Sequence, residues 1–584
     1  MNTLVIVLIA AVVLVCAYAG YGRWLAKTWG VDPNAKTPAV RLEDGKDYVP
    51  TKGWTVFAHQ FSSIAGAGPV TGAIQAAAFG WLPVLLWVLI GGVFFGAVTD
   101  FGALYASVKN DGKSMGLLIE KYIGKTGRKL FLLFCWLFCG IVIAAFADMV
   151  AGTFNAFDAD GAQVEAAFTN GAAGMVSIMF MVFAVVFGFI QKKFNFSGWR
   201  EAVIGIIFIV LSFAVGMNCP LVFGKTAWSY ITFVYIFFAA VLPMWMLKQP
   251  RDYMTTFMFG AMIAGAVIGL LVAHPTMNLP VFTGFSNAKL GTMFPILFVT
   301  VACGAVSGFH SLVSSGTSSK TVENEKDMLK VGYGAMVLES LLAVLALCVA
   351  GAAAAADGTP ASGTPFQIFS RGVAGFFEMF GVPVSIATVF MTMCVSALAL
   401  TSLDAVARIG RMSFQELFSV DDMEHAEGWR KLCCNVYFST FITLVFGFIL
   451  TQIGYANIWP LFGSANQLLS ALVLATLCVF LKVTGRNNKM LFPPLVIMLC
   501  VTFTALVQRL IAMVKAISAA ASTAIPAGET TWGAVFIANG LQLILAVLLI
   551  VLGLNIVFHS VKSYTTCDAP EAKDNATATA KANA

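Results

Sequence analysis

One apolar stretch of this chain is interrupted in its middle by residues that disfavour a helix. The stretch covers residues 54–78, and its interruption reads Ser62-Ser63-Ile64-Ala65-Gly66-Ala67-Gly68-Pro69. Glycine is a poor helix former, and proline removes one backbone donor and obstructs a carbonyl of the preceding turn. Inside a bilayer, non-helical backbone is tolerated only where protein or a water-filled cavity covers it. Because such breaks mark binding sites in transporters, we predict a substrate site lined by Ser63, Gly66, Gly68 and Pro69.

The composition indicates a membrane protein. Hydrophobic residues make up 59% of the chain and charged residues 11%, whereas soluble domains carry about 25% charged residues. Apolar stretches long enough to cross a bilayer recur throughout, and they predict an all-α integral membrane protein with about fifteen transmembrane helices. These lie near residues 3–22, 54–78, 82–107, 129–152, 171–190, 200–218, 228–247, 254–273, 292–315, 333–355, 383–407, 434–453, 457–481, 491–514 and 531–558. The lipid bilayer is therefore the expected surrounding, and the net charge of +6 does not indicate a nucleic-acid partner.

Basic residues crowd every second loop between these predicted helices. The first loop holds six of them between Arg23 and Lys52, and the third holds six between Lys109 and Lys129. The intervening loops are nearly free of them and hold chiefly Lys225, Lys289, Arg371 and Lys515. Because basic loops stay in the cytoplasm, this alternation predicts a periplasmic N-terminus and a cytoplasmic C-terminus.

The predicted helices also suggest an internal repeat. Five helices is an odd number, so two consecutive five-helix units are inverted, as in a leucine-transporter-like 5+5 core with extra flanking helices. The leading helix of the second unit, 228–247, carries Pro243, which we expect to interrupt it. The resulting segments are an N-terminal helix and cytoplasmic loop (1–53), the first repeat (54–218), the second repeat (219–407), a cytoplasmic loop (408–433), four extra helices (434–562) and a disordered cytoplasmic tail (563–584).

The ionisable side chains inside predicted helices include His59, Asp100, His310, Glu339 and Asp404. A charge at the bilayer centre costs about 2.5–3.5 kcal/mol on insertion scales, so such groups normally face a partner or a cavity. Histidine has an unperturbed pKa near 6.5, which makes His59 and His310 candidates for carrying a coupling proton. Each could also be a packing histidine.

We expect structural or gating roles for the two aspartates. Asp404 and Arg408 are four residues apart and predict an ion pair along one helix face. Asp100 lies close to the third, basic loop.

Hydroxyl groups gather around the predicted helix 292–315. Ser307 and His310 follow small residues and are candidate substrate contacts, whereas Gly304 and Gly308 form a GxxxG face typical of close packing. Ser314, Ser315 and Thr317 lie at the cytoplasmic end. Oxygen ligands suit a hard cation, so sodium is the alternative coupling ion. Such hydroxyls can also bond the preceding turn and take no part in coupling.

Several longer motifs resemble signatures of the carbon starvation protein A family. They include Gly66-Ala67-Gly68-Pro69, Pro250-Arg251-Asp252-Tyr253, the run from Ala302 to His310, and Trp459-Pro460-Leu461-Phe462-Gly463 followed by Ala465-Asn466-Gln467. The resemblance implies a bacterial inner-membrane protein of the starvation response that takes up peptides or pyruvate with protons. The family often has a His-His pair before the broken helix, where this chain has His59-Gln60.

Other classes of function fit the sequence less well. A channel or a sensor could dispense with paired breaks and inverted halves. An intramembrane enzyme could use Ser307 and His310 as a dyad, but no acid is obviously placed to orient His310. The chain has no HExxH motif and no Cys/His group with zinc spacing. We therefore expect no enzymatic activity, no cofactor and no metal site.

Overall fold

Helices dominate the computed structural model of this chain, which describes all residues except 1, 46, 159, 195–197, 244, 288–289, 421–424, 426, 523–531 and 568–584. The strands in this described part are β1 (Ser286–Asn287) and β2 (Gly291–Thr292), which pair antiparallel. Eleven of the described helices are long and apolar enough to cross a membrane, or twelve if one bent pair is a single span. The prediction of an all-α multi-pass membrane protein is confirmed, whereas the count of fifteen spans stays a prediction.

Every predicted transmembrane segment contains helix. The helices in these segments are α1 (Thr3–Ala17) with α2 (Arg23–Trp29), α4 (Gly53–Ile64) with α5 (Ala67–Ala76), α6 (Trp81–Gly91) with α7 (Ala97–Val108), α9 (Lys125–Phe154), α10 (Ala167–Phe194), α11 (Trp199–Asn218), α12 (Lys225–Val241), α13 (Lys248–Ala273), α14 (Met293–Thr300) with α15 (Gly308–Gly316), α16 (Ala335–Ala353), α18 (Val384–Phe418), α20 (Val436–Thr451), α21 (Tyr455–Val483), α22 (Phe492–Ser522) and α23 (Trp532–Thr566). Shorter helices are α3 (Pro38–Arg41), α8 (Met115–Tyr122), α17 (Pro365–Glu378) and α19 (Gly428–Cys434).

Some predicted boundaries were wrong. The helix α18 continues to Phe418, so the predicted loop 408–433 begins as helix, and α23 continues to Thr566 into the predicted disordered tail. The helix α17 was not expected; a Thr364–Gln367 capping box begins it. The acidic run 421–424 and the tail from 568 lie outside the described residues.

The second break lies elsewhere than expected. Pro243 falls in the connection between α12 and α13, which are separate helices rather than one interrupted span. The predicted span 292–315 is the interrupted one, because the chain leaves the helix between α14 and α15. Each interrupted pair is followed by a helix with a π-helical turn, at Gly92–Gly96 and at Lys330–Gly334. This internal correspondence begins at α4, where the first repeat was predicted to start, and at α14. The division into repeats 54–218 and 219–407 stays a prediction.

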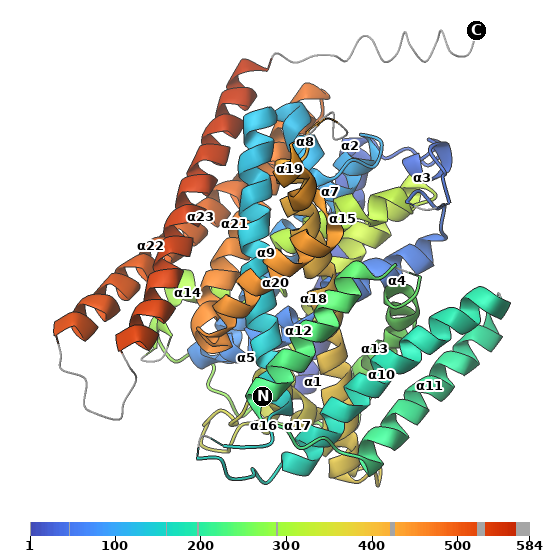
Figure 1. Cartoon of the computed structure of the whole chain (residues 1–584), viewed down its shortest axis with the longest axis vertical. Coiled ribbons are helices and arrows are strands. Elements are labelled where there is room, and N and C mark those ends of the chain that lie inside the picture. Colours follow the sequence, from blue (N-terminus) through green and yellow to red (C-terminus); the bar gives the residue numbers. More distant parts are fainter. Residues whose placement is uncertain are drawn as a thin grey trace.

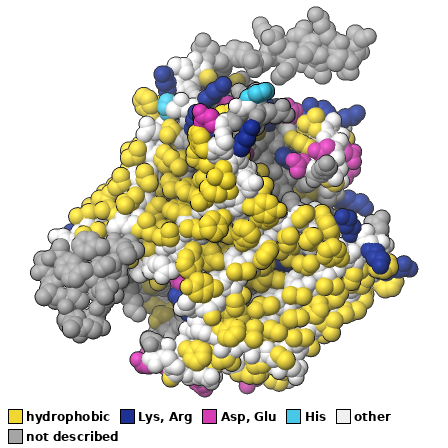
Figure 2. Space-filling model, in the orientation of Figure 1, with side chains coloured by type: hydrophobic (Ala, Val, Ile, Leu, Met, Phe, Trp, Pro, Cys, Tyr) yellow, Lys and Arg dark blue, Asp and Glu magenta, His cyan; other side chains and the backbone are white. Residues whose placement is uncertain are grey.

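The centre of the molecule is built on α9 and α18, which pack along each other and are contacted by α12 and α20. The hairpin α10–α11 and the pair α22–α23 flank this centre on opposite sides (Figure 1). Hydrophobic side chains cover most of the visible surface of these helices (Figure 2), as contact with lipid requires.

The alternate basic loops meet at one end of the helices. Lys109 Nζ lies 2.6 Å from Glu325 Oε1, and Lys320 Nζ lies 3.8 Å from Asp47 Oδ2. These ion pairs join the first, third and ninth predicted loops. Lys and Arg side chains accordingly gather toward the top of Figure 2.

Candidate functional site: a pocket between two interrupted helices

The predicted break between α4 and α5 is present. Ala65 (φ −70°, ψ 65°) and Gly66 (φ −85°, ψ −151°) leave the helical conformation. Residues 62–71 are all buried. The break therefore lies inside the protein, where polar groups can reach its free backbone atoms.

Side chains of α21 bond the backbone freed by the second break. Trp459 Nε1 donates to the carbonyl of Thr300 (3.2 Å), and Gln467 Nε2 donates to that of Phe298 (2.7 Å). Asn466 Oδ1 accepts from the backbone N–H of Phe309 at 3.1 Å. The motif from Trp459 to Gln467 thus has a structural reason: it supplies the polar partners that an interrupted membrane helix needs.

The two breaks approach each other closely. A Cβ added to Gly304 would lie 3.5 Å from Pro69 Cα, and one added to Gly72 would lie 2.6 Å from the carbonyl oxygen of Thr300. Added at Gly68 it would meet the side chain of Cys303, and at Gly66 that of Ser402. The absence of side chains at these positions lets the half-helices pack.

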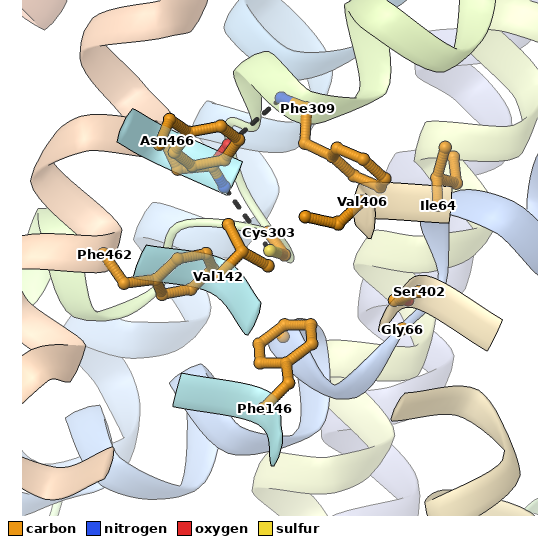
Figure 3. A pocket seen from close by; sticks show the side chains of 12 residues that line it. Ile64, Gly66, Val142, Phe146, Cys303, Phe309, Ser402, Val406, Phe462 and Asn466 are labelled. Carbon is orange, nitrogen blue, oxygen red and sulfur yellow. Dashed lines mark hydrogen bonds between the residues drawn. The ribbon is translucent and has the colours of Figure 1, made fainter. Parts of the chain in front are cut away.

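A small pocket with a cavity volume of about 10 Å³ lies between the breaks. Its walls are mostly apolar, and Figure 3 shows Val142 and Phe146 of α9 facing it together with Phe462. Its polar groups come from Ser402, Cys303 and Asn466, whose Nδ2 donates to Cys303 Sγ at 3.5 Å. Gly66 and Gly68 line it as well.

The other predicted substrate contacts lie near the pocket without lining it. Ser63 is buried, and its Oγ has no hydrogen-bond partner among the described residues. Pro69 packs at the crossing with Gly304. Ser307 accepts a hydrogen bond from Asn466 Nδ2 (3.0 Å) and precedes α15.

His310 lies between two carboxylates. Its Nδ1 is 3.0 Å from Asp100 Oδ2, and its Nε2 is 3.3 Å from Glu339 Oε2. The three side chains come from α15, α7 and α16 and are each 0% exposed. The expectation that no acid orients His310 was therefore wrong, and Asp100 is a partner of this histidine deep in the protein.

His59 lies in a different environment. Its Nδ1 is 4.0 Å from Asp252 Oδ2, and its side chain is 26% exposed. The next residue, Gln60, donates to Ser314 Oγ (2.8 Å) and accepts from Ser318 Oγ (2.6 Å). Ser315 Oγ donates to the carbonyl of Ser311 at 2.7 Å, and Thr317 caps the C-terminus of α15. Ser314 and Ser315 are thus already bonded within the protein.

The predicted pair between Asp404 and Arg408 is absent. Asp404 instead pairs with Arg251 and accepts from Tyr235 Oη at 2.9 Å, while Arg251 Nη2 lies 3.1 Å from Asp252 Oδ1. Arg408 donates to the carbonyl of Leu242 at 2.7 Å and also to that of Ala239, at the end of α12. The free carbonyls of a helix C-terminus attract cationic side chains, and they hold Arg408 away from Asp404.

Comparisons with known proteins agree with this description. Residues 2–359 and 352–505 match the family described as carbon starvation protein CstA. The chain is 32% identical over 582 residues to the peptide transporter CstA of Escherichia coli (strain K12), covering 86% of this chain and 80% of that protein. It is 36% identical over 364 residues to the pyruvate/proton symporter BtsT of the same organism, covering 60% of this chain and 49% of that protein. A solved Eremococcus coleocola manganese transporter aligns with a TM-score of 0.47 at 10% identity over 89% of this chain and 99% of that one, which is too distant to decide the fold.

Proposed function

The chain belongs to the carbon starvation protein CstA family, and from this premise we propose that it takes up a small carboxylate-bearing nutrient, a peptide or pyruvate, by proton symport. The observation that carries the proposal is the buried pocket between two interrupted helices. Relatives are named as peptide transporters and as a pyruvate/proton symporter. We place the protein in the bacterial inner membrane, with its N-terminus in the periplasm, and in the response to carbon starvation.

The chemistry of the pocket suits a small carboxylate. Helices α5 and α15 begin at the two breaks, and free N–H groups at a helix N-terminus favour an anion. Asn466 can offer a further polar contact, and the aromatic walls accept the apolar part of the substrate. Ser63, Gly66, Gly68, Pro69 and Ser307 shape this pocket or support it. We retain the leucine-transporter-like inverted repeat as the framework for alternating access, with α4–α5 and α14–α15 as its leading elements.

Substrate identity can be tested by exchange. Purified protein in proteoliposomes loaded with unlabelled pyruvate should take up labelled pyruvate, and an external dipeptide should compete if it binds the same pocket. In the matching experiment the proteoliposomes are loaded with unlabelled alanyl-alanine, and uptake of labelled alanyl-alanine is measured. Exchange no faster than in protein-free liposomes for both compounds would contradict the proposed substrate class.

We expect His310 to be required for proton coupling. The variant His310→Gln cannot accept a proton at its side chain, so an imposed pH gradient should no longer drive accumulation. His559→Gln on α23 is the matched control and should accumulate substrate as the wild type does. Normal accumulation by His310→Gln would show that His310 is not required for proton coupling.

We also expect uptake to be independent of sodium. Ser314 accepts a hydrogen bond from Gln60, and Ser315 donates one to the Ser311 carbonyl, so both hydroxyls already have partners within the protein. Uptake rates measured with sodium replaced by choline should be unchanged at constant pH gradient. A strict sodium requirement that ignores pH would reverse the assignment of the coupling ion.

A further inference from the structure

We propose that Glu339 carries the coupling proton, while Asp100 fixes the orientation of His310. This inference rests on the proposed proton symport and assigns the proton to one side chain. Asp100 and His310 form a hydrogen bond at 3.0 Å. Glu339 lies within ion-pair distance of His310 at 3.3 Å, but neither of its oxygens makes a hydrogen bond within the described part of the chain.

The charges of the three groups favour a proton on Glu339. Two ionised acids and one imidazolium would leave a net negative charge in a site that is 0% exposed. No Lys or Arg among the described residues forms an ion pair with any of the three. An uncompensated buried charge is costly, and a proton on Glu339 makes the site neutral.

The surrounding helices offer no competing proton carrier. Helices α5 and α6 and the π-helical turn 92–96, which pack near α16, contain no ionisable residue in their sequences. The remaining ionisable groups on neighbouring elements are engaged or point elsewhere. Tyr333 donates to the carbonyl of Val93, Lys330 pairs with Asp327, and His59 lies near Asp252. Lys248 and Arg251 belong to the cluster around Asp404. Cys16, Arg371 and Glu378 are exposed, and the thiol of Cys303 lies on the pocket side.

The proton has a direct route to His310. In the neutral form of the site both ring nitrogens of His310 carry a proton. Once the symported proton has left Nε2, Nδ1–H still donates to Asp100 and the Nε2 lone pair faces Glu339, so the O–H bond of Glu339 can break as an N–H bond forms on Nε2. The protonated acid with a neutral imidazole and the carboxylate with an imidazolium carry the same net charge, and the reverse transfer restores the first of these two forms. Asp100 keeps its hydrogen bond throughout and acts as a positioning residue.

The same helix links this proton site to the pocket. His310 lies in the first turn of α15, and the backbone N–H of its neighbour Phe309 bonds Asn466 at the pocket wall. A substrate that shifts the start of α15 therefore also changes the separation of His310 from Glu339. Proton transfer and substrate binding can be coupled through this one rigid helix.

The test compares exchange with accumulation for Glu339→Gln in proteoliposomes. Glutamine mimics the protonated acid but cannot release a proton. We expect counterflow of labelled substrate to persist and lose its pH dependence, whereas accumulation driven by a pH gradient is lost. Glu378→Gln, an exposed position at the end of α17, is the matched control. Accumulation by Glu339→Gln at the wild-type level would overturn the inference.

Two further measurements keep the inference testable if Glu339→Gln does not reach the membrane. The infrared spectrum of the wild type at neutral pH should contain a protonated carboxylic-acid band that moves in Glu339→Asp. The absence of a band that responds to this substitution would overturn the assignment. A wild type that neither exchanges nor accumulates either compound would instead refute the proposed transport function.

Discussion

Replacing Gly68 with leucine should abolish uptake while leaving the protein in the membrane. Even a Cβ at this position would meet the Sγ and Cβ atoms of Cys303, and a leucine side chain would extend into the pocket. The clash lies at the crossing of the two breaks, so neither half-helix can move aside without disturbing the other. Uptake and membrane-inserted yield should be measured on the same preparation.

The control for this substitution is Gly260→Leu. Gly260 is exposed on α13, and a Cβ there would meet nothing within 4 Å. Its variant should transport normally, which separates the effect of the pocket from that of losing a membrane glycine. Normal transport by Gly68→Leu would show that the break at α4–α5 does not form the substrate site.

Removing one charge from the cluster around Asp404 should destabilise the protein strongly. Asp404 is 0% exposed and pairs with Arg251, which is itself buried. Removal of one partner from a buried ion pair leaves an uncompensated charge and costs about 3–5 kcal/mol. Asp404→Asn should therefore lower the midpoint of thermal unfolding and the folded yield, with little change in which substrate is preferred.

Two double variants distinguish the partners of Asp404. Asp404→Asn with Arg251→Gln should recover part of the lost stability because neither charge remains alone. Asp404→Asn with Arg408→Gln should recover nothing, since Arg408 bonds the carbonyls that end α12. Recovery of stability by the variant that combines Asp404→Asn with Arg408→Gln, and by that variant alone, would support the ion pair between Asp404 and Arg408 that the sequence suggested. A changed substrate preference at normal yield would place Asp404 in the binding site.

The first break could be predicted because its cause is local. Two glycines and Pro69 within four residues disfavour a helix whatever surrounds them. The second break has no proline, and it depends on Trp459, Asn466 and Gln467 of a distant helix to bond its backbone. The spacing of Gly304 and Gly308 is typical of helix packing and so did not indicate a break. The single Pro243 suggested a break in the wrong place.

The same difference between local and long-range causes explains which features of the site could be predicted. His310 stands out in the sequence because an ionisable group in a membrane helix is costly unless it faces a partner or a cavity. Its partners Asp100 and Glu339 were each visible as intramembrane acids, but sequence spacing does not show which helices place their side chains together. The spacing of Asp404 and Arg408 suggested a pair that the tertiary contacts of both residues replace.

Accumulation of labelled substrate in proteoliposomes tests the central claim most directly. An inside-alkaline pH gradient, imposed without sodium, should drive labelled pyruvate or labelled dipeptide above its external concentration, and a protonophore should abolish the excess. Uptake that only equilibrates under every proton and sodium gradient would contradict secondary active transport and indicate a channel.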